Sequence, residues 1–175
     1  AFNLFVQLMH SYGRDVAAAV TITFNWDMVA FVPMIGVNIA TTSLVGRYMG
    51  AGAPDTAERA AYSGLKTASF YTFTVWVLFV TIPHLLVGMF TPDMPGLDYS
   101  DVIPQAVFMI RLASFYLVSD ALMLVFGGAL RGAGDTQWVM RTSVVCHWFM
   151  TTATYLQIKV FNVPPSVVWI VFVVL

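Results

Sequence analysis

Asp120 stands in an apolar stretch of the sequence, with no basic residue between Phe115 and Arg131. A carboxylate inside a bilayer is costly, and acids in such places are functional by default. Tyr116 comes four residues before Asp120 and Gly127 seven after it, so on a helix the three share one face. The spacing predicts a site for H⁺ or Na⁺ at Asp120, with Tyr116 as helper; the alternative is a carboxyl that only packs helices together.

The depth of Asp120 follows from the turn after it. Asp120 precedes Arg131 by 11 residues, which at ~1.5 Å per residue is ~16 Å. That distance is about half of a ~30 Å hydrocarbon core. If Arg131 lies at the cytoplasmic surface, Asp120 lies near the middle of the membrane.

A second acid, Asp27, precedes Arg47 by 20 residues, or ~30 Å along a helix, and is expected near the outer interface. Thr23 and Asn38 fall roughly on its face. This pattern suits the wall of an outward cavity and equally an interfacial acid beside an anchoring Trp26. The residues predicted to line a cavity are Asp27, Asn38, Thr23, Met123 and Gly127.

The composition indicates a membrane protein. The 175 residues are 59% hydrophobic and 10% charged, whereas a soluble domain has roughly a quarter charged residues. A net charge of -1 argues against nucleic acid as a partner. One cysteine and three scattered histidines predict no metal site beyond Na⁺ at Asp120, and no catalytic constellation or cofactor motif occurs, so an enzyme is not expected.

The apolar segments predict an all-α bundle of about six membrane-spanning helices, because a span needs about 20 mostly apolar residues. The first and last segments are short, and we expect a fragment of a longer protein. The predicted helices cover residues 2–9, 15–49, 55–89, 100–130 and 136–160, with a last one from about 165. Pro33 and Pro83 predict kinks.

Two similar turns separate these helices. Gly50-Ala-Gly52-Ala-Pro ends one helix, and Arg131-Gly132-Ala-Gly134-Asp135 ends another. Glycine supplies a left-handed cap after a helix, and Pro or Asp suits the start of the next. Both turns are basic, whereas the loop at 91–101 carries three Asp and no Lys or Arg, so the positive-inside rule places the turns in the cytoplasm.

In two stretches the chain resembles the multidrug and toxic compound extrusion (MATE) family of transporters. One runs from Val29-Ala-Phe-Val-Pro-Met-Ile-Gly into Thr42-Ser-Leu-Val-Gly-Arg-Tyr-Met-Gly-Ala-Gly-Ala-Pro-Asp-Thr; the other runs from Ser119-Asp-Ala into Gly128-Ala-Leu-Arg-Gly-Ala-Gly-Asp-Thr. The resemblance implies that residues 1–175 form one transmembrane lobe, the C-terminal of two, with a family-like core at about 13–160. Asp120 then matches the acid on the fourth helix of that lobe, which binds the coupling ion.

The implied function is H⁺- or Na⁺-coupled antiport that exports amphipathic organic cations. The implied partners are membrane lipid and the N-terminal lobe of the same polypeptide, in the inner (plasma) membrane of a bacterium. The alternatives are a lipid-linked oligosaccharide flippase of the same superfamily, for which only Arg111 is a candidate basic residue in the cavity, and a membrane scaffold that transports nothing. A scaffold would tolerate Asp120→Asn without loss of function.

Overall fold

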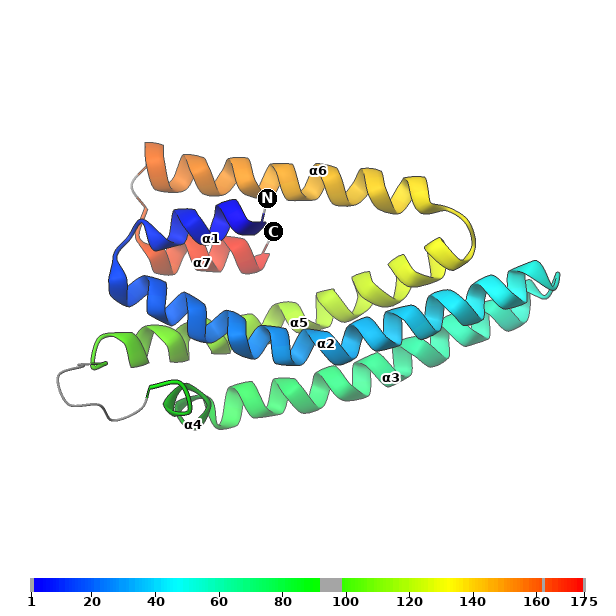
Figure 1. Ribbon diagram of the computed structural model, residues 1–175, viewed down its shortest axis with the longest axis horizontal. Coiled ribbons are helices and arrows are strands. Elements are labelled where there is room, and N and C mark those ends of the chain that lie inside the picture. The colour runs from blue at the N-terminus through cyan, green and yellow to red at the C-terminus, as the bar shows by residue number, and fades with distance from the viewer. Residues whose placement is uncertain (1, 92–98, 162, 175) are drawn as a thin grey trace. The chain divides into compact units, whose positions relative to one another are not determined.

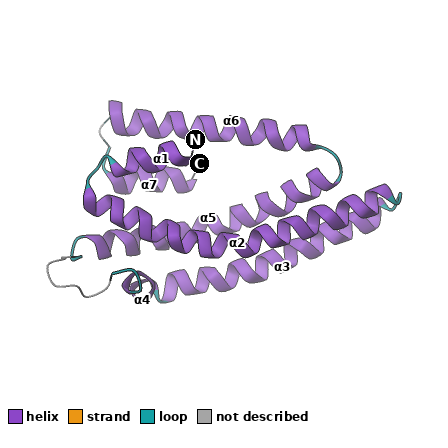
Figure 2. Ribbon diagram, in the orientation of Figure 1, coloured by secondary structure: helices purple, strands orange, loops and turns teal. Residues whose placement is uncertain are grey.

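The computed structural model describes residues 2–91, 99–161 and 163–174, which form helices joined by turns, as Figure 1 shows. No strand occurs in these ranges (Figure 2), so the predicted all-α class is confirmed. Asp93 and Asp98 of the predicted acidic loop lie outside the described residues. The helices are α1 (Phe2–His10), α2 (Arg14–Gly50), α3 (Pro54–Thr81), α4 (Pro83–Gly88), α5 (Val102–Gly132), α6 (Thr136–Tyr155), the π-helix η1 (Leu156–Val160) and α7 (Pro165–Val174).

The chain divides into two compact units, and four of its helices contribute to both. The first unit comprises Ala1–Asp27, Val77–Tyr116 and Val145–Leu175, and the second comprises Met28–Trp76 and Leu117–Val144. Each unit has its own set of packed side chains. The prediction that residues 1–175 form one lobe stays a prediction.

Aromatic rings form the core of the first unit. Helices α1 and α7 lie side by side (Figure 1), and the rings of Phe5 and Phe172 stack with their centroids 4.2 Å apart. Phe24 of α2 adds a ring 5.4 Å from Trp169, which is fully buried. The Trp169 indole N–H donates to the carbonyl of Met109 at 3.2 Å, so its polar edge is satisfied inside the apolar core.

Hydrogen bonds from side chains to the backbone link separate segments of the chain in this unit. Tyr12, between α1 and α2, donates its hydroxyl to the carbonyl of Val163, just before α7. Burial raises the pKa of the Tyr12 hydroxyl, so it stays protonated as a donor. Trp26 of α2 donates its indole N–H to the carbonyl of Leu86 in α4 at 2.9 Å, and its ring meets Phe90 edge to face.

A cluster of four buried side chains joins three helices of the second unit. Met34 of α2, Ala68 of α3, and Ala121 and Val125 of α5 are buried against one another. Alanine at two of these four positions lets three helices approach closely, because a short side chain keeps the backbones near each other.

Helices α5 and α2 approach each other closely at two glycines spaced four residues apart. A Cβ added at Gly132 would lie 2.5 Å from the carbonyl oxygen of Thr42 and 3.0 Å from the nitrogen of Gly46. One added at Gly128 would lie 3.0 Å from the carbonyl oxygen of Asn38. Real Cβ atoms do not come within 3.0 Å of backbone, so this contact requires glycine at 132.

The two basic turns close in the same way. Gly52 and Gly134 have φ of 69° and 94°, the left-handed conformation expected of a cap, whereas Gly50 is still helical. In each turn the residue after this glycine donates its N–H to the carbonyl five residues earlier, at 2.9 Å in both cases. This is the Schellman arrangement. Asp135 then caps α6, its carboxylate accepting the N–H of Trp138 at 3.2 Å.

Proline affects the helices in two different ways. The single helix predicted at 55–89 is wrong, because α3 ends before Pro83 and α4 starts there. Ile82, with φ of -125° and ψ of 39°, is not helical, as expected for a residue before proline. Pro33, in contrast, lies inside the continuous helix α2. The helix predicted to end at 160 finishes instead as the wider turn η1.

Five threonine hydroxyls in α3 and α6 donate hydrogen bonds within their own helices. Each donates to the backbone carbonyl four residues earlier, at 2.6–3.0 Å. Such a hydroxyl has its hydrogen-bond donor satisfied by its own helix. The residues are Thr67, Thr74, Thr81, Thr151 and Thr154.

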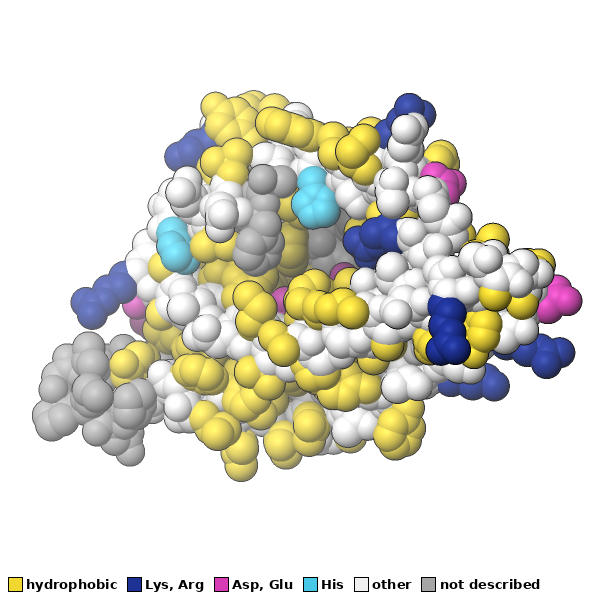
Figure 3. Space-filling model, turned by 45° about the vertical axis from the view of Figure 1, so that its right-hand side comes forward, with side chains coloured by type: hydrophobic (Ala, Val, Ile, Leu, Met, Phe, Trp, Pro, Cys, Tyr) yellow, Lys and Arg dark blue, Asp and Glu magenta, His cyan; other side chains and the backbone are white. Residues whose placement is uncertain are grey.

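The surface is strongly apolar. Figure 3 shows hydrophobic side chains over much of the visible face, and large side chains such as Phe70 are up to 78% exposed. Among the described residues, α2 and α5 are the two helices both long and apolar enough to cross a membrane by length and composition. Exposed apolar area of this extent suits contact with lipid.

We expect Gly132→Ala to destabilise the protein by about 1–3 kcal/mol, because the new methyl group meets backbone that cannot move aside. The matched control is Gly127→Ala on the same helix, where a Cβ would lie 3.6 Å from the flexible end of Arg131. Melting of both variants in detergent, compared with the unsubstituted protein, measures the difference. Equal melting temperatures for the two variants would contradict the packing described here.

Candidate functional site

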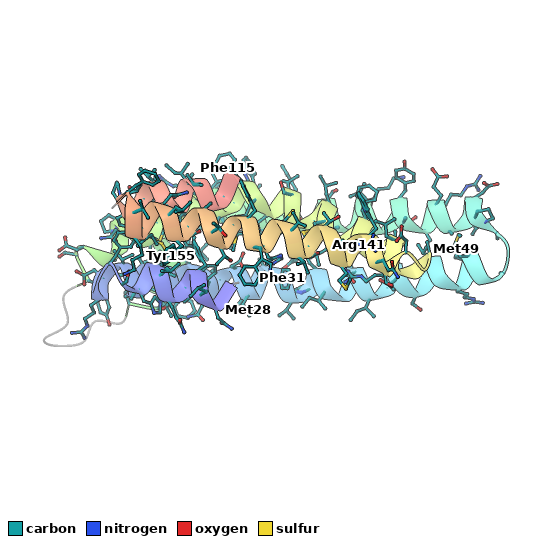
Figure 4. All side chains as sticks on the ribbon, turned by 90° about the horizontal axis from the view of Figure 1, so that it is seen from above. Met28, Phe31, Met49, Phe115, Arg141 and Tyr155 are labelled. Atoms are coloured by element: carbon teal, nitrogen blue, oxygen red, sulfur yellow. The ribbon has the colours of Figure 1, made fainter. Side chains whose placement is uncertain are left out.

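Asp27 and Tyr116 meet in the first unit. Asp27 lies on α2 and Tyr116 on α5, 89 residues apart in the sequence, and the Tyr116 hydroxyl donates a hydrogen bond to the Asp27 carboxylate. Both side chains are half-buried. Their chain neighbours Met28 and Phe115, labelled in Figure 4, are 59% and 64% exposed and so occupy other faces of their helices. The acid expected near the outer interface therefore has a tyrosine partner on another helix.

Aromatic rings surround this hydrogen bond. The Tyr116 ring meets Phe172 edge to face, with centroids 6.1 Å apart. Phe24, three residues before Asp27 on α2, meets the same Phe172 edge to face at 6.3 Å. Trp26, next to Asp27, is fixed by its bond to α4. An apolar setting strengthens a hydrogen bond to a carboxylate, because little water competes for it.

Asp120 lies in the interior of α5, within the second unit, and is half-buried. It directly precedes Ala121, part of the core that α2, α3 and α5 share. Along α5 it follows Tyr116 by one helical turn, as the sequence spacing requires. Carboxylate and hydroxyl oxygens are ligands that hard cations accept. The assignment of Asp120 and Tyr116 to one cation site stays a prediction.

The other residues predicted to line a cavity have varied surroundings. Thr23 is fully buried, and its hydroxyl donates to the carbonyl of Ala19 on its own helix. Asn38 is half-buried, and its amide donates to the carbonyl of Leu124 on α5 at 2.6 Å. Met123 is 54% exposed. Asn38 thus acts as a hydrogen-bonded bridge between α2 and α5.

The residues of the second basic turn have mainly structural contacts. The Arg131 guanidinium donates through Nε to the carbonyl of Gly127 at 3.0 Å, which covers one of the last carbonyls of α5. Gly132 packs on α2, Gly134 supplies the left-handed residue, and Asp135 caps α6. A basic residue at a helix C-terminus also interacts favourably with the helix dipole.

Sequence reasoning did not pair Asp27 with Tyr116. The available signal was that each is a polar group in an apolar helix, which must find a partner, but helical spacing favoured Asp120 as the partner of Tyr116. In the described part of the chain no group of three or more His, Cys, Asp or Glu is placed to hold a metal ion.

Comparisons with known proteins agree on one family. The sequence model of the family described as MatE matches residues 1–156. The chain is 31% identical to a probable multidrug resistance protein NorM of Pasteurella multocida, over 84% of this chain and 30% of that protein. It is 29% identical to one of Mannheimia succiniciproducens, over 99% and 37%, and 29% identical to the multidrug resistance protein PmpM of Pseudomonas aeruginosa, over 84% and 30%. The chain spans about a third of the length of these relatives.

We expect Asn38→Ala to destabilise the protein by about 1–2 kcal/mol, the typical contribution of a hydrogen bond that bridges two helices. Met123→Ala should change stability far less, because that side chain is half-exposed. Thermal melting in detergent compares the two. An unchanged melting temperature for Asn38→Ala, with altered substrate affinity, would instead make Asn38 a cavity residue.

Proposed function

The chain belongs to the MatE family of multidrug and toxic compound extrusion transporters, and on that premise we propose that it is one lobe of a cation-coupled antiporter. The complete transporter, with a second lobe in the same polypeptide, exports amphipathic organic cations across a bacterial inner membrane. Relatives named as multidrug resistance proteins support the class of substrate. The apolar surface supports lipid as the environment.

The observation that carries the proposal is the position of Asp120. It is a half-buried acid inside an apolar helix that ends in the glycine-rich turn at 131–135. Acids inside membrane-spanning helices are rare and mark ion pathways by default. Asp120 binds the coupling ion, H⁺ or Na⁺, and Tyr116 supplies a second oxygen one turn away.

Binding of an ion shifts the equilibrium between the two conformations of the transporter only if they differ in their affinity for it. The ion at Asp120 favours one of the outward- and inward-open states, and its release favours the other. The negative charge of the Asp120 carboxylate after release of the ion also attracts a cationic substrate, so the ion and the substrate occupy the lobe in turn. Exchange of one for the other is antiport.

The flippase alternative has less support, because an anionic lipid headgroup needs basic residues in the cavity. Arg111 is the candidate, and its side chain is exposed on α5. Arg111 comes nine residues before Asp120, about half a helical rotation away. This places its guanidinium on a different face of α5 from the acid.

We expect Asp120→Asn to reduce ion-driven efflux to the background rate while expression and melting temperature are kept. The amide has nearly the shape of the carboxyl, but it carries no charge and takes up no proton. The measurement is the initial rate of ethidium transport by the complete transporter in proteoliposomes, driven by an imposed Na⁺ or H⁺ gradient.

The control for this experiment is Asp101→Asn, an exposed acid just before α5, which should keep the full rate. Unchanged efflux in Asp120→Asn would remove Asp120 from the coupling site. Loss of efflux in both variants would indicate a general effect of charge rather than a specific site.

A further inference from the structure

Asp27 is an acid that the proposed coupling reaction does not use. Its carboxylate accepts the hydroxyl of Tyr116, the residue proposed to contribute an oxygen to the cation. The contact joins α2 to α5 within the first unit, and both groups are half-buried. Asp27 thus contacts a proposed ligand of the ion from a second helix.

A tyrosine hydroxyl carries one proton and can use its oxygen lone pairs as acceptors. To bind a cation, the oxygen must direct a lone pair at it, so the proton has to point elsewhere. An ionised carboxylate is a strong acceptor for that proton and increases the electron density on the oxygen. Groups behind the direct ligands of a metal commonly orient those ligands in this way.

We propose that Asp27 is the positioning residue of the cation site: it holds the proton of the Tyr116 hydroxyl, so that the Tyr116 oxygen is left to bind the coupling cation. The proposal rests on the proposed function, because it assumes that the cation binds at Asp120 and Tyr116 on α5. It adds a residue from a different helix, α2, whose movement would change the affinity for the ion.

The surroundings of the pair support a role in orientation. The contact with Phe172 fixes the tilt of the Tyr116 ring, so the position of the hydroxyl oxygen is set by packing and only its proton remains to be directed. Helix α2 is already held at the adjacent residue, because Trp26 bonds to Leu86 and packs on Phe90. The Asp27 carboxylate is therefore not the sole anchor of this part of α2.

The test is a titration of ethidium transport against Na⁺ at fixed pH, and against H⁺ at fixed Na⁺, by the complete transporter in proteoliposomes. The variants are Asp27→Ala, Asp27→Asn, Tyr116→Phe and the double variant Asp27→Ala/Tyr116→Phe. We expect Asp27→Ala to raise the half-saturating concentration of the coupling cation about tenfold, the usual loss when such an orienting group is removed. The maximal rate should change little.

Two comparisons separate orientation from a merely structural bond. Asp27→Asn keeps an acceptor oxygen, so its effect should be smaller than that of Asp27→Ala. The double variant should be no worse than Tyr116→Phe alone, because Asp27 has nothing left to orient. Effects that multiply in the double variant, or an unchanged half-saturating concentration in Asp27→Ala, would overturn the proposal.

Asp120→Asn in the same assay separates the role of Asp27 from the coupling site itself. If Asp120→Asn abolishes transport while Asp27→Ala behaves as the unsubstituted protein, the coupling site stands and the role of Asp27 fails. If Asp120→Asn transports normally, the proposed function fails first. Melting in detergent without Na⁺ checks folding, and if Asp27→Ala does not fold, the cycle of Asp27→Asn with Tyr116→Phe decides the outcome.

Discussion

The contact between α2 and α5 is the constraint on which the rest of the second unit depends. At Gly132 the two helices are close enough that a single methyl group would collide with the backbone of Thr42. Within a bilayer, apolar helices gain no hydrophobic free energy by leaving lipid for one another. Their association therefore relies on tight packing and on interhelical hydrogen bonds. Small residues provide the first, and Asn38 provides the second by bonding to the Leu124 carbonyl. The core of Met34, Ala68, Ala121 and Val125 adds α3 to the same contact.

Several polar side chains in this apolar chain bond to other helices. Trp26 and Trp169 donate to backbone carbonyls of other helices, and Asn38 does the same. The acceptors of these bonds are neutral carbonyl groups, so no charge is buried in making them. The bond from Tyr116 to Asp27 differs, because its acceptor carries a charge when ionised. Burying a charge is expensive, which is why Asp27, more than the other polar bridges, calls for a functional explanation.

The sequence predicted the parts of this structure that local chemistry decides. The positions of the basic turns followed from glycine and aspartate, and the all-α class followed from the lengths of the apolar runs. The break at Pro83 was predicted only as a kink. Residue type alone does not distinguish a proline that starts a new helix, as Pro83 does, from one inside a continuous helix, such as Pro33 in α2. The pairing of Asp27 with Tyr116 could not be predicted, since it depends on how two distant helices face each other. Helical periodicity relates Tyr116 to Asp120 but says nothing about α2.

The hydroxyls that bond within α3 and α6 have a consequence for how the chain enters a membrane. Scales that sort segments by side-chain polarity count threonine as polar, and among the described helices only α2 and α5 pass such a criterion. In α3 the hydroxyls of Thr67, Thr74 and Thr81 are already bonded to their own backbone, so the cost of transferring them into hydrocarbon is partly met within the helix. An insertion machinery that tests the folded helix rather than its composition would therefore accept α3 and α6 more readily than a hydropathy plot suggests.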